Sequence, residues 1–391
     1  MSAPHLPVAD RMADIQPFHV MALLARARAL ESAGRSIVHM EIGEPDFPTA
    51  APIVAAGQAA LADGRTQYTP AAGLYRLREA IAAYYQSHFG ARVDPARILI
   101  TPGASGALQL ALTALVDPGR AVLMSDPGYP CNRNLVRVLD GEPVLVPTDA
   151  TQGYQLTPEL ARAHWHERTA AVMVASPANP SGTLLTFQQL TELYALTRER
   201  GAALVVDEIY QGLTYGTDPE TALTVADDMF VVNSFSKYFG MTGWRLGWLV
   251  APDSHVALLE RLAQNLFLAA PTLSQYAALA AFTPEALAVL DERRRIFAQR
   301  RDFLLPALRN LGFDIPVVPE GAFYLYAGCS RFTADSFAFC YQLLEQAGVA
   351  ITPGIDFGRY RAERHVRFAY TTSLENLQEG VVRLGGYLKR L

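Results

Sequence analysis

"NSFSKYFGMTGWRLGW", residues 233–248, contains Lys237, one of only two lysines in a chain that has 31 arginines. The other lysine, Lys389, lies close to the C-terminus. A guanidinium stays protonated, whereas a lysine amine in a desolvated or cationic setting can attack a carbonyl. The ordinary alternative is a surface lysine in a glycine-rich turn, so the segments around this stretch must decide between the two interpretations.

Short apolar, β-rich runs alternate with helical patterns on both sides of this stretch, which is typical of a mostly parallel sheet covered on both faces. Beyond about residue 275 a long charged helical segment leads into an α+β pattern. We therefore predict an α/β fold: a large domain over 49–275 with a mostly parallel seven-stranded sheet covered by helices, a smaller α+β domain over 276–391, and an N-terminal segment, 1–48, that packs with the smaller domain. The apolar runs are 97–101, 121–125, 143–147, 170–176, 203–208, 230–236 and 245–250.

Composition excludes several classes of protein. The net charge of −5 and the pI near 5.9 argue against nucleic acid or an anionic membrane as the main partner. The most apolar stretch, 262–282, is interrupted by polar residues and Pro271, so it is core or interface and not a membrane span. Three scattered cysteines and an N-terminus without a signal-peptide pattern favour a reduced, cytoplasmic setting. The histidines show no ligand spacing, so no catalytic metal is expected.

Chemically distinctive residues follow five of the predicted strands, and ligands of open α/β sheets bind beyond the carboxyl ends of strands. The segment "PGASGA" (102–107) opens a helix with small residues, whose N–H groups could cradle a phosphate. Singly, these features are explained by a turn, a packed ring or a helix cap. Together they meet the needs of pyridoxal 5'-phosphate: an amine, a phosphate cup, a carboxylate for the pyridine nitrogen, a donor to the ring oxygen and a flat stacking face. The residues are Gly103, Ala104, Ser105, Tyr129, Asn179, Asp207, Tyr210 and Lys237.

From "IGEPDFPT" (42–49) to "RFAYTTS" (367–373) the chain resembles the class I and II aminotransferases of pyridoxal-phosphate fold type I. The strongest match is the lysine signature "SFSKYFGMTGWRLG" (234–247). The segments "YTPAAG", "SPANPSG", "DEIY", "PEGAFY" and "TPG" follow the family's other landmarks in the same order. The resemblance implies a transaminase that moves an amino group between an L-amino acid and a 2-oxo acid by a ping-pong mechanism.

The resemblance also implies roles for individual residues. Lys237 would bind the cofactor aldehyde and then shuttle the substrate proton, while Asp207 would keep the pyridine nitrogen protonated. Tyr210 and Asn179 would hydrogen-bond the ring oxygen, and Tyr129 would stack on the ring. The catalytic set is therefore Lys237, Asp207 and Tyr210.

Phosphate, carboxylate and subunit contacts complete this expectation. The resemblance places Ser234, Ser236 and Arg245 around the phosphate with the start of the 103–105 helix. Tyr68 would reach the phosphate of a neighbouring subunit, which implies a homodimer with shared sites. Arg367 would bind the substrate α-carboxylate as a bidentate pair beside the backbone of Gly43 and with Asn179.

Two alternatives stay open at this stage. The same fold supports β-elimination, as in carbon–sulfur lyases, because small loop changes divert the same chemistry. A regulator that senses the cofactor is a further alternative, although few residues precede "IGEPDF" for a DNA-binding domain and the charge is acidic. The neutral stretch "QNLFLAAP" (264–271) favours neutral aliphatic or aromatic amino acids, with glutamate and 2-oxoglutarate as one possible pair. It does not identify the substrates.

Overall fold

The computed structural model describes residues 6–217 and 220–391. Its large sheet has seven strands in the order β2-β8-β7-β6-β5-β3-β4, and β8 runs opposite to the other six. The predicted mostly parallel seven-stranded sheet is therefore confirmed. The strands are β2 (Ile98–Thr101), β3 (Ala121–Asp126), β4 (Glu142–Pro147), β5 (Thr169–Ala175), β6 (Ala203–Asp207), β7 (Phe230–Ser234) and β8 (Gly247–Val250).

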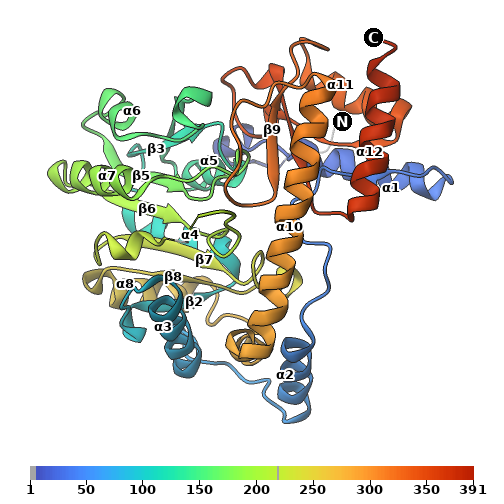
Figure 1. The fold of residues 1–391 in the computed structure, drawn as a ribbon. Coiled ribbons are helices and arrows are strands. Elements are labelled where there is room, and N and C mark those ends of the chain that lie inside the picture. The colour runs from blue at the N-terminus through green and yellow to red at the C-terminus, as the bar shows by residue number, and fades with distance from the viewer. Residues whose placement is uncertain (1–5, 218–219) are drawn as a thin grey trace.

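Successive side chains of a strand point to opposite faces of the sheet. In the central strands the side chains on both faces are apolar, so the sheet packs against a hydrophobic cluster on each side. In β5, Ala171 and Met173 pack with the helices of one face, and Val172 and Val174 belong to the cluster on the other. Figure 1 shows helices along the whole stack of strands, with α7 beside β6, α4 beside β7 and α3 beside β2. The first face is covered by α4 (Gly103–Leu115), α5 (Pro130–Val138) and α8 (Asp253–Leu266); the second cluster includes α2 (Ala51–Ala62), α3 (Tyr75–Phe89), α6 (Pro158–Ala163), α7 (Phe187–Glu199) and α9 (Thr272–Leu279).

A smaller unit contains the C-terminal part of the chain together with its N-terminal part. Its antiparallel sheet has the order β11-β12-β9, and β1 pairs in parallel with β10, so segments about 310 residues apart share one layer. The long α10 (Pro284–Leu311) runs from the large sheet to this unit (Figure 1). The proposed boundaries at 48/49 and 275/276 stay predictions. The remaining elements are α1 (His19–Ser32), β1 (Val38–His39), β9 (Tyr324–Gly328), α11 (Ser336–Gln342), β10 (Val349–Ala350), β11 (Thr352–Pro353), β12 (His365–Ala369) and α12 (Leu374–Leu388).

The predicted strand at β8 begins two residues later than its apolar run. The run starts at Arg245, whereas β8 starts at Gly247. The reason is local: the 3-10 turn η5 (Thr242–Trp244) precedes Arg245, which has the left-handed φ of 54° and so cannot continue a strand. This backbone reversal turns the Arg245 side chain toward the end of the sheet where α4 begins.

Among the described residues, no single helix is long and apolar enough to cross a membrane. The segments Thr272–Phe282 and Pro284–Leu311 meet the length and composition criteria only as a pair, and they are bent by 82° relative to each other.

Candidate active site

A cavity of about 300 Å³ lies where the large sheet meets the smaller unit. It opens beyond the carboxyl ends of β3, β5, β6 and β7, where ligands of open α/β sheets bind. Most of the predicted site residues line this one cavity, although they come from both ends of the chain. These residues are Gly43, Ala104, Ser105, Tyr129, Asn179, Asp207, Tyr210, Ser236, Lys237, Arg245 and Arg367.

Three predicted site residues lie outside the cavity lining. Gly103 sits behind it, where a Cβ would lie 2.8 Å from the Arg245 Nη2 atom. Ser234 is buried, and its Oγ lies 2.9 Å from the Oγ of Ser236, so it supports that side chain from below. Tyr68 is 82% exposed in the connection between α2 and α3, outside the cavity of its own chain. The roles predicted for these three residues stay predictions.

The amine of Lys237 faces the cavity from the loop that follows β7, and its Nζ donates a hydrogen bond of 2.7 Å to the backbone oxygen of Gly43. Burial is the main cause that lowers the pKa of Lys237 to about 8. The positive charges of Arg367 and Arg245 lower this pKa further, and the carboxylate of Glu44 opposes the shift. The amine is consequently far easier to deprotonate than an ordinary lysine amine, as a nucleophile or base requires.

The carboxylate of Asp207 closes β6 and is almost completely buried. Its Oδ1 accepts a 3.0 Å hydrogen bond from the backbone N–H of Ile209. Burial raises the pKa of Asp207 to about 6, because the charged form loses hydration. A cationic group placed against this carboxylate would restore its charged form, so the position suits a protonated heterocyclic nitrogen.

The start of α4 provides an anion site at the same end of the sheet. Pro102 precedes the helix and no side chain caps it, so the first amides have no side-chain partner. The helix dipole adds positive potential there. Ser236 and Arg245 line the cavity with Ala104 and Ser105 from this first turn, so hydroxyl, guanidinium and amide donors converge.

Arg367, on β12, is held in one orientation by polar and aromatic contacts. Its Nη1 donates to Asn179 Oδ1 at 2.9 Å, and its Nη2 donates to the backbone oxygen of Glu41 at 2.6 Å. The guanidinium carbon lies 4.2 Å from the ring centre of Tyr324 and 4.7 Å from that of Phe357. Its buried Nε has no hydrogen-bond partner. A fixed planar guanidinium of this kind is suited to a carboxylate ligand.

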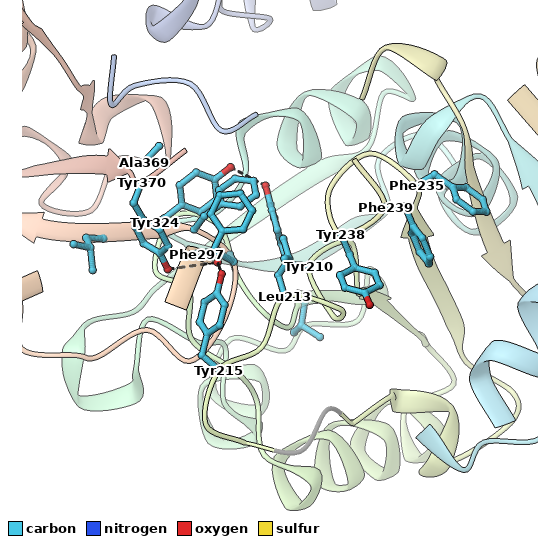
Figure 2. Packing of buried hydrophobic residues seen from close by; sticks show 14 of the residues in the cluster. Tyr210, Leu213, Tyr215, Phe235, Tyr238, Phe239, Phe297, Tyr324, Ala369 and Tyr370 are labelled. Carbon is cyan, nitrogen blue, oxygen red and sulfur yellow. Dashed lines mark hydrogen bonds between the residues drawn. The ribbon is translucent and has the colours of Figure 1, made fainter. Parts of the chain in front are cut away.

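Tyr324 is a site residue that the sequence analysis did not single out. Its hydroxyl lies 2.8 Å from the Tyr210 hydroxyl, and Figure 2 shows the two rings together in the aromatic cluster between the sheet and the smaller unit. A Cβ at Gly43 would overlap the Tyr324 hydroxyl, so only glycine fits beside this ring. Tyr324 ends the "PEGAFY" segment, which was the available signal for it.

The sequence analysis also missed an apolar part of the lining that comes from the N-terminus. Phe18, Val20 and Met21 line the cavity at the start of α1, and the Phe18 ring centre lies 6.5 Å from that of Tyr129. No motif marks these residues, because their role depends on a contact between distant parts of the chain.

These residues fit pyridoxal phosphate. They provide an uncapped helix start for its phosphate, a buried carboxylate for its ring nitrogen, an aromatic side chain for its ring face and an amine of lowered pKa for its aldehyde. The fold is thus that of the fold type I pyridoxal-phosphate enzymes, and the residues of the cavity would suit their cofactor.

Comparison with known proteins narrows this class. Residues 35–384 match the family model described as aminotransferase class I and II, and the chain belongs to that family. It is a pyridoxal-phosphate-dependent transaminase, as the sequence analysis predicted, and nothing in the comparisons favours the elimination alternative.

The relatives align over nearly their full length. A valine–pyruvate aminotransferase of Mycobacterium tuberculosis is 40% identical over 96% of this chain and 97% of its own. The crystal structure of an aminotransferase from the same organism has a TM-score of 0.95 and 39% identity, covering 99% of this chain and 100% of that one. Aspartate aminotransferase from Thermus thermophilus with maleate has a TM-score of 0.92 and 34% identity, with the same coverage. The names of these relatives thus include a neutral amino acid, valine, and an acidic one, aspartate.

Proposed function

We propose that this transaminase holds pyridoxal phosphate in the cavity around Lys237 and exchanges amino groups between neutral, apolar L-amino acids and 2-oxo acids. The observation that carries the proposal is the joint presence of the Lys237 amine, the Asp207 carboxylate and the uncapped start of α4 in one cavity. A surface lysine in a turn would have neither the buried acid nor the anion site beside it.

The cofactor-binding residues would act together. When bound, pyridoxal phosphate supplies an aldehyde that condenses with amines and a ring that accepts electrons from the substrate Cα. Asp207 would keep the ring nitrogen protonated, and Tyr210 and Asn179 would hold the ring oxygen. Tyr129 would cover one face of the ring.

The phosphate would lie at the start of α4. There the N–H groups of Ala104 and Ser105 can donate to it, together with the side chains of Ser236 and Arg245. Gly103 keeps the backbone close to Arg245, and Ser234 supports Ser236 from the protein interior.

Lys237 would also move the substrate proton. With its amine free and neutral, Lys237 Nζ would take the proton from the substrate Cα and hold it for the return transfer. The lowered pKa near 8 supports this role, because a general base works best when its pKa lies close to the working pH.

Arg367 would bind the substrate α-carboxylate. Asn179 already holds its Nη1, and Glu41 holds its Nη2 through the backbone, so the guanidinium is oriented before substrate arrives. Gly43 leaves room beside it, since any side chain there would meet Tyr324. Preorganisation of this kind reduces the entropy lost when the substrate binds.

The substrate side chain would meet an apolar wall. The cations that line the cavity within the described chain are Lys237, Arg245 and Arg367, and each has a role above. Phe18, Val20 and Met21 contribute apolar surface. A distal carboxylate would thus lose hydration without gaining an ion pair from this chain, whereas an aliphatic side chain gains about 0.8 kcal/mol per buried methylene.

A homodimer with shared sites is part of the proposal. Tyr68 is 82% exposed and lies outside the cavity of its own chain. In a dimer it would reach the phosphate bound by the other subunit, with which its hydroxyl can form a hydrogen bond.

A panel of single half-reactions tests the substrate proposal. Each amino acid is added to the holoenzyme without an oxo acid, and the conversion of the cofactor absorbance to the pyridoxamine phosphate form is followed. We expect fast conversion with valine, leucine, methionine or phenylalanine and slow conversion with aspartate. Preference for aspartate would contradict the apolar assignment, and no conversion with any amino acid would contradict the function.

A further inference from the structure

The start of α1 has an unusual cap. The residue before the helix is Phe18, which offers no side-chain acceptor to the first amides. These amides are bound by a carboxylate from far along the chain: His19 N–H donates to Asp356 Oδ1 at 2.7 Å, and Val20 N–H donates to Asp356 Oδ2 at 2.8 Å. Asp356 is only 3% exposed. A buried carboxylate that satisfies two first-turn donors and faces the positive end of the helix dipole is a strong anchor.

The ion pairs made by the residues just before α1 are exposed and contribute less. Arg11 pairs with Asp140, and Asp14 pairs with Arg137, but each of these side chains is substantially exposed to solvent. Exposed pairs typically contribute ~0–1 kcal/mol. The Asp356 cap is therefore the buried polar contact at the start of α1, next to the three residues that line the cavity, Phe18, Val20 and Met21. The rest of the helix is held by apolar side chains buried in the core.

The segment that carries Asp356, residues 354–360, is itself fixed to the large domain. Arg133 of α5 donates to the backbone oxygen of Asp356 at 2.9 Å. Asp126, at the end of β3, accepts the backbone N–H groups of Arg359 and Tyr360 at 2.9 and 3.1 Å. The segment is consequently anchored on both sides of Phe357.

The same segment also touches the proposed carboxylate site, because Phe357 lies 4.7 Å from the guanidinium carbon of Arg367. One short segment thus supports two parts of substrate recognition: the arginine for the α-carboxylate and the apolar residues for the side chain.

We propose that Asp356 is a positioning residue for substrate selectivity. By capping α1 across the smaller unit, it holds Phe18, Val20 and Met21 at a set distance from Arg367, and the site thereby selects amino acids with bulky apolar side chains. This inference rests on the proposed function, since it assumes that Arg367 binds the α-carboxylate.

The test compares leucine with alanine, whose methyl group has little apolar surface to bury. In Asp356→Ala we expect the ratio of kcat/KM for leucine over alanine to fall by about tenfold or more, the range for losing one methylene-sized contact in a pocket. The loss should arise mainly from a higher KM for leucine, with cofactor absorbance and cofactor affinity unchanged. Asp356→Asn keeps one acceptor oxygen and should restore part of the ratio.

Ser373→Ala is the matched control. Ser373 caps α12 in the same unit by accepting the N–H group of Asn376 at 3.2 Å, and it does not line the cavity. This variant should keep the wild-type ratio. An equal fall in both variants would show that general destabilisation is the cause, and it would overturn the proposal.

Met21→Ala covers the case in which Asp356→Ala does not fold. Met21 is 54% exposed, so its loss should leave folding intact while lowering the leucine-to-alanine ratio directly. An unchanged ratio in Met21→Ala and Val20→Ala would overturn the proposal. Failure of the wild type to react with either amino acid would instead contradict the proposed function.

Discussion

The reactivity of Lys237 depends on its amine and on the buried, cationic surroundings that lower the pKa of this amine. A sequence pattern predicts the amine but not the surroundings. The lysine signature predicted the residue, but the lowered pKa depends on burial and on Arg367, which lies 130 residues further along the chain. Asp207 is similar, because its position after a strand was predictable whereas its near-complete burial was not. For single residues, the motifs thus predicted which side chains form the site, but not the burial that shifts their pKa values.

The Lys237 pKa leads to a pH prediction. Because burial disfavours the charged amine, the folded-state pKa of about 8 lies below the ordinary value of 10.5, and the reactive neutral form predominates above about pH 8. The rate at which apoprotein binds pyridoxal phosphate covalently should rise up to about pH 8 and level off above about pH 9. Stopped-flow absorbance measures this rate. A rate that keeps rising tenfold per pH unit through pH 10 would indicate an unshifted lysine amine.

At the scale of elements, strands were easier to predict than the contacts at their ends. Near-continuous apolar runs identified the seven strands, because strands buried on both faces tolerate few polar residues. β8 begins after the start of its apolar run because Arg245 has a left-handed backbone conformation. The hydrophobicity of the segment does not predict this conformation. Likewise, the α1 cap joins residues 336 positions apart, so no local pattern predicts that Val20 and Met21 line the site.

The start of α4 provides a prediction at this scale. Gly103 has a φ of +72°, and a Cβ there would press on the Arg245 guanidinium. Gly103→Ala should therefore weaken cofactor affinity by about tenfold or more, since a strained backbone of ~1–2 kcal/mol and a displaced Arg245 both disturb the phosphate site. A pyridoxal phosphate titration of apoprotein, followed by fluorescence, measures the affinity.

Gly90→Ala is the control for backbone strain. Gly90 has a φ of +67°, ends α3, and has open space around its Cα. This variant should lose stability without losing cofactor affinity. Equal affinities for the Gly103→Ala variant and the wild type would contradict the phosphate assignment.

For the whole molecule, the sequence predicted the large sheet and the smaller unit because two different patterns follow each other along the chain. The pairing of β1 with β10 joins the two ends of the chain, and no local sequence pattern predicts it. This pairing places the N-terminal segment beside a site whose other residues mostly lie 60 to 330 positions further along the chain. The proposed homodimer also belongs to the level of the whole molecule, and the exposed Tyr68 is the side chain proposed to reach the other subunit.

Tyr68→Phe tests the shared site. We expect the variant to stay dimeric by analytical ultracentrifugation while its pyridoxal phosphate affinity falls by about tenfold, the value of roughly one hydrogen bond to a charged group. Tyr75→Phe is a suitable control, because Tyr75 is also exposed, at 54%, and has no predicted role in the phosphate site. A monomeric wild type, or an unchanged affinity in Tyr68→Phe, would contradict the composite site.

Lys237 should carry the cofactor, and reductive trapping shows whether it does. The holoenzyme is treated with borohydride, digested and mapped by mass spectrometry, with the exposed Lys389 as the internal comparison. The prediction is one reduced pyridoxal phosphate group on the peptide that contains Lys237 and none on Lys389. A cofactor-loaded protein that yields no label on Lys237, or that yields its label on Lys389, would rule out Lys237 as the residue that binds the cofactor.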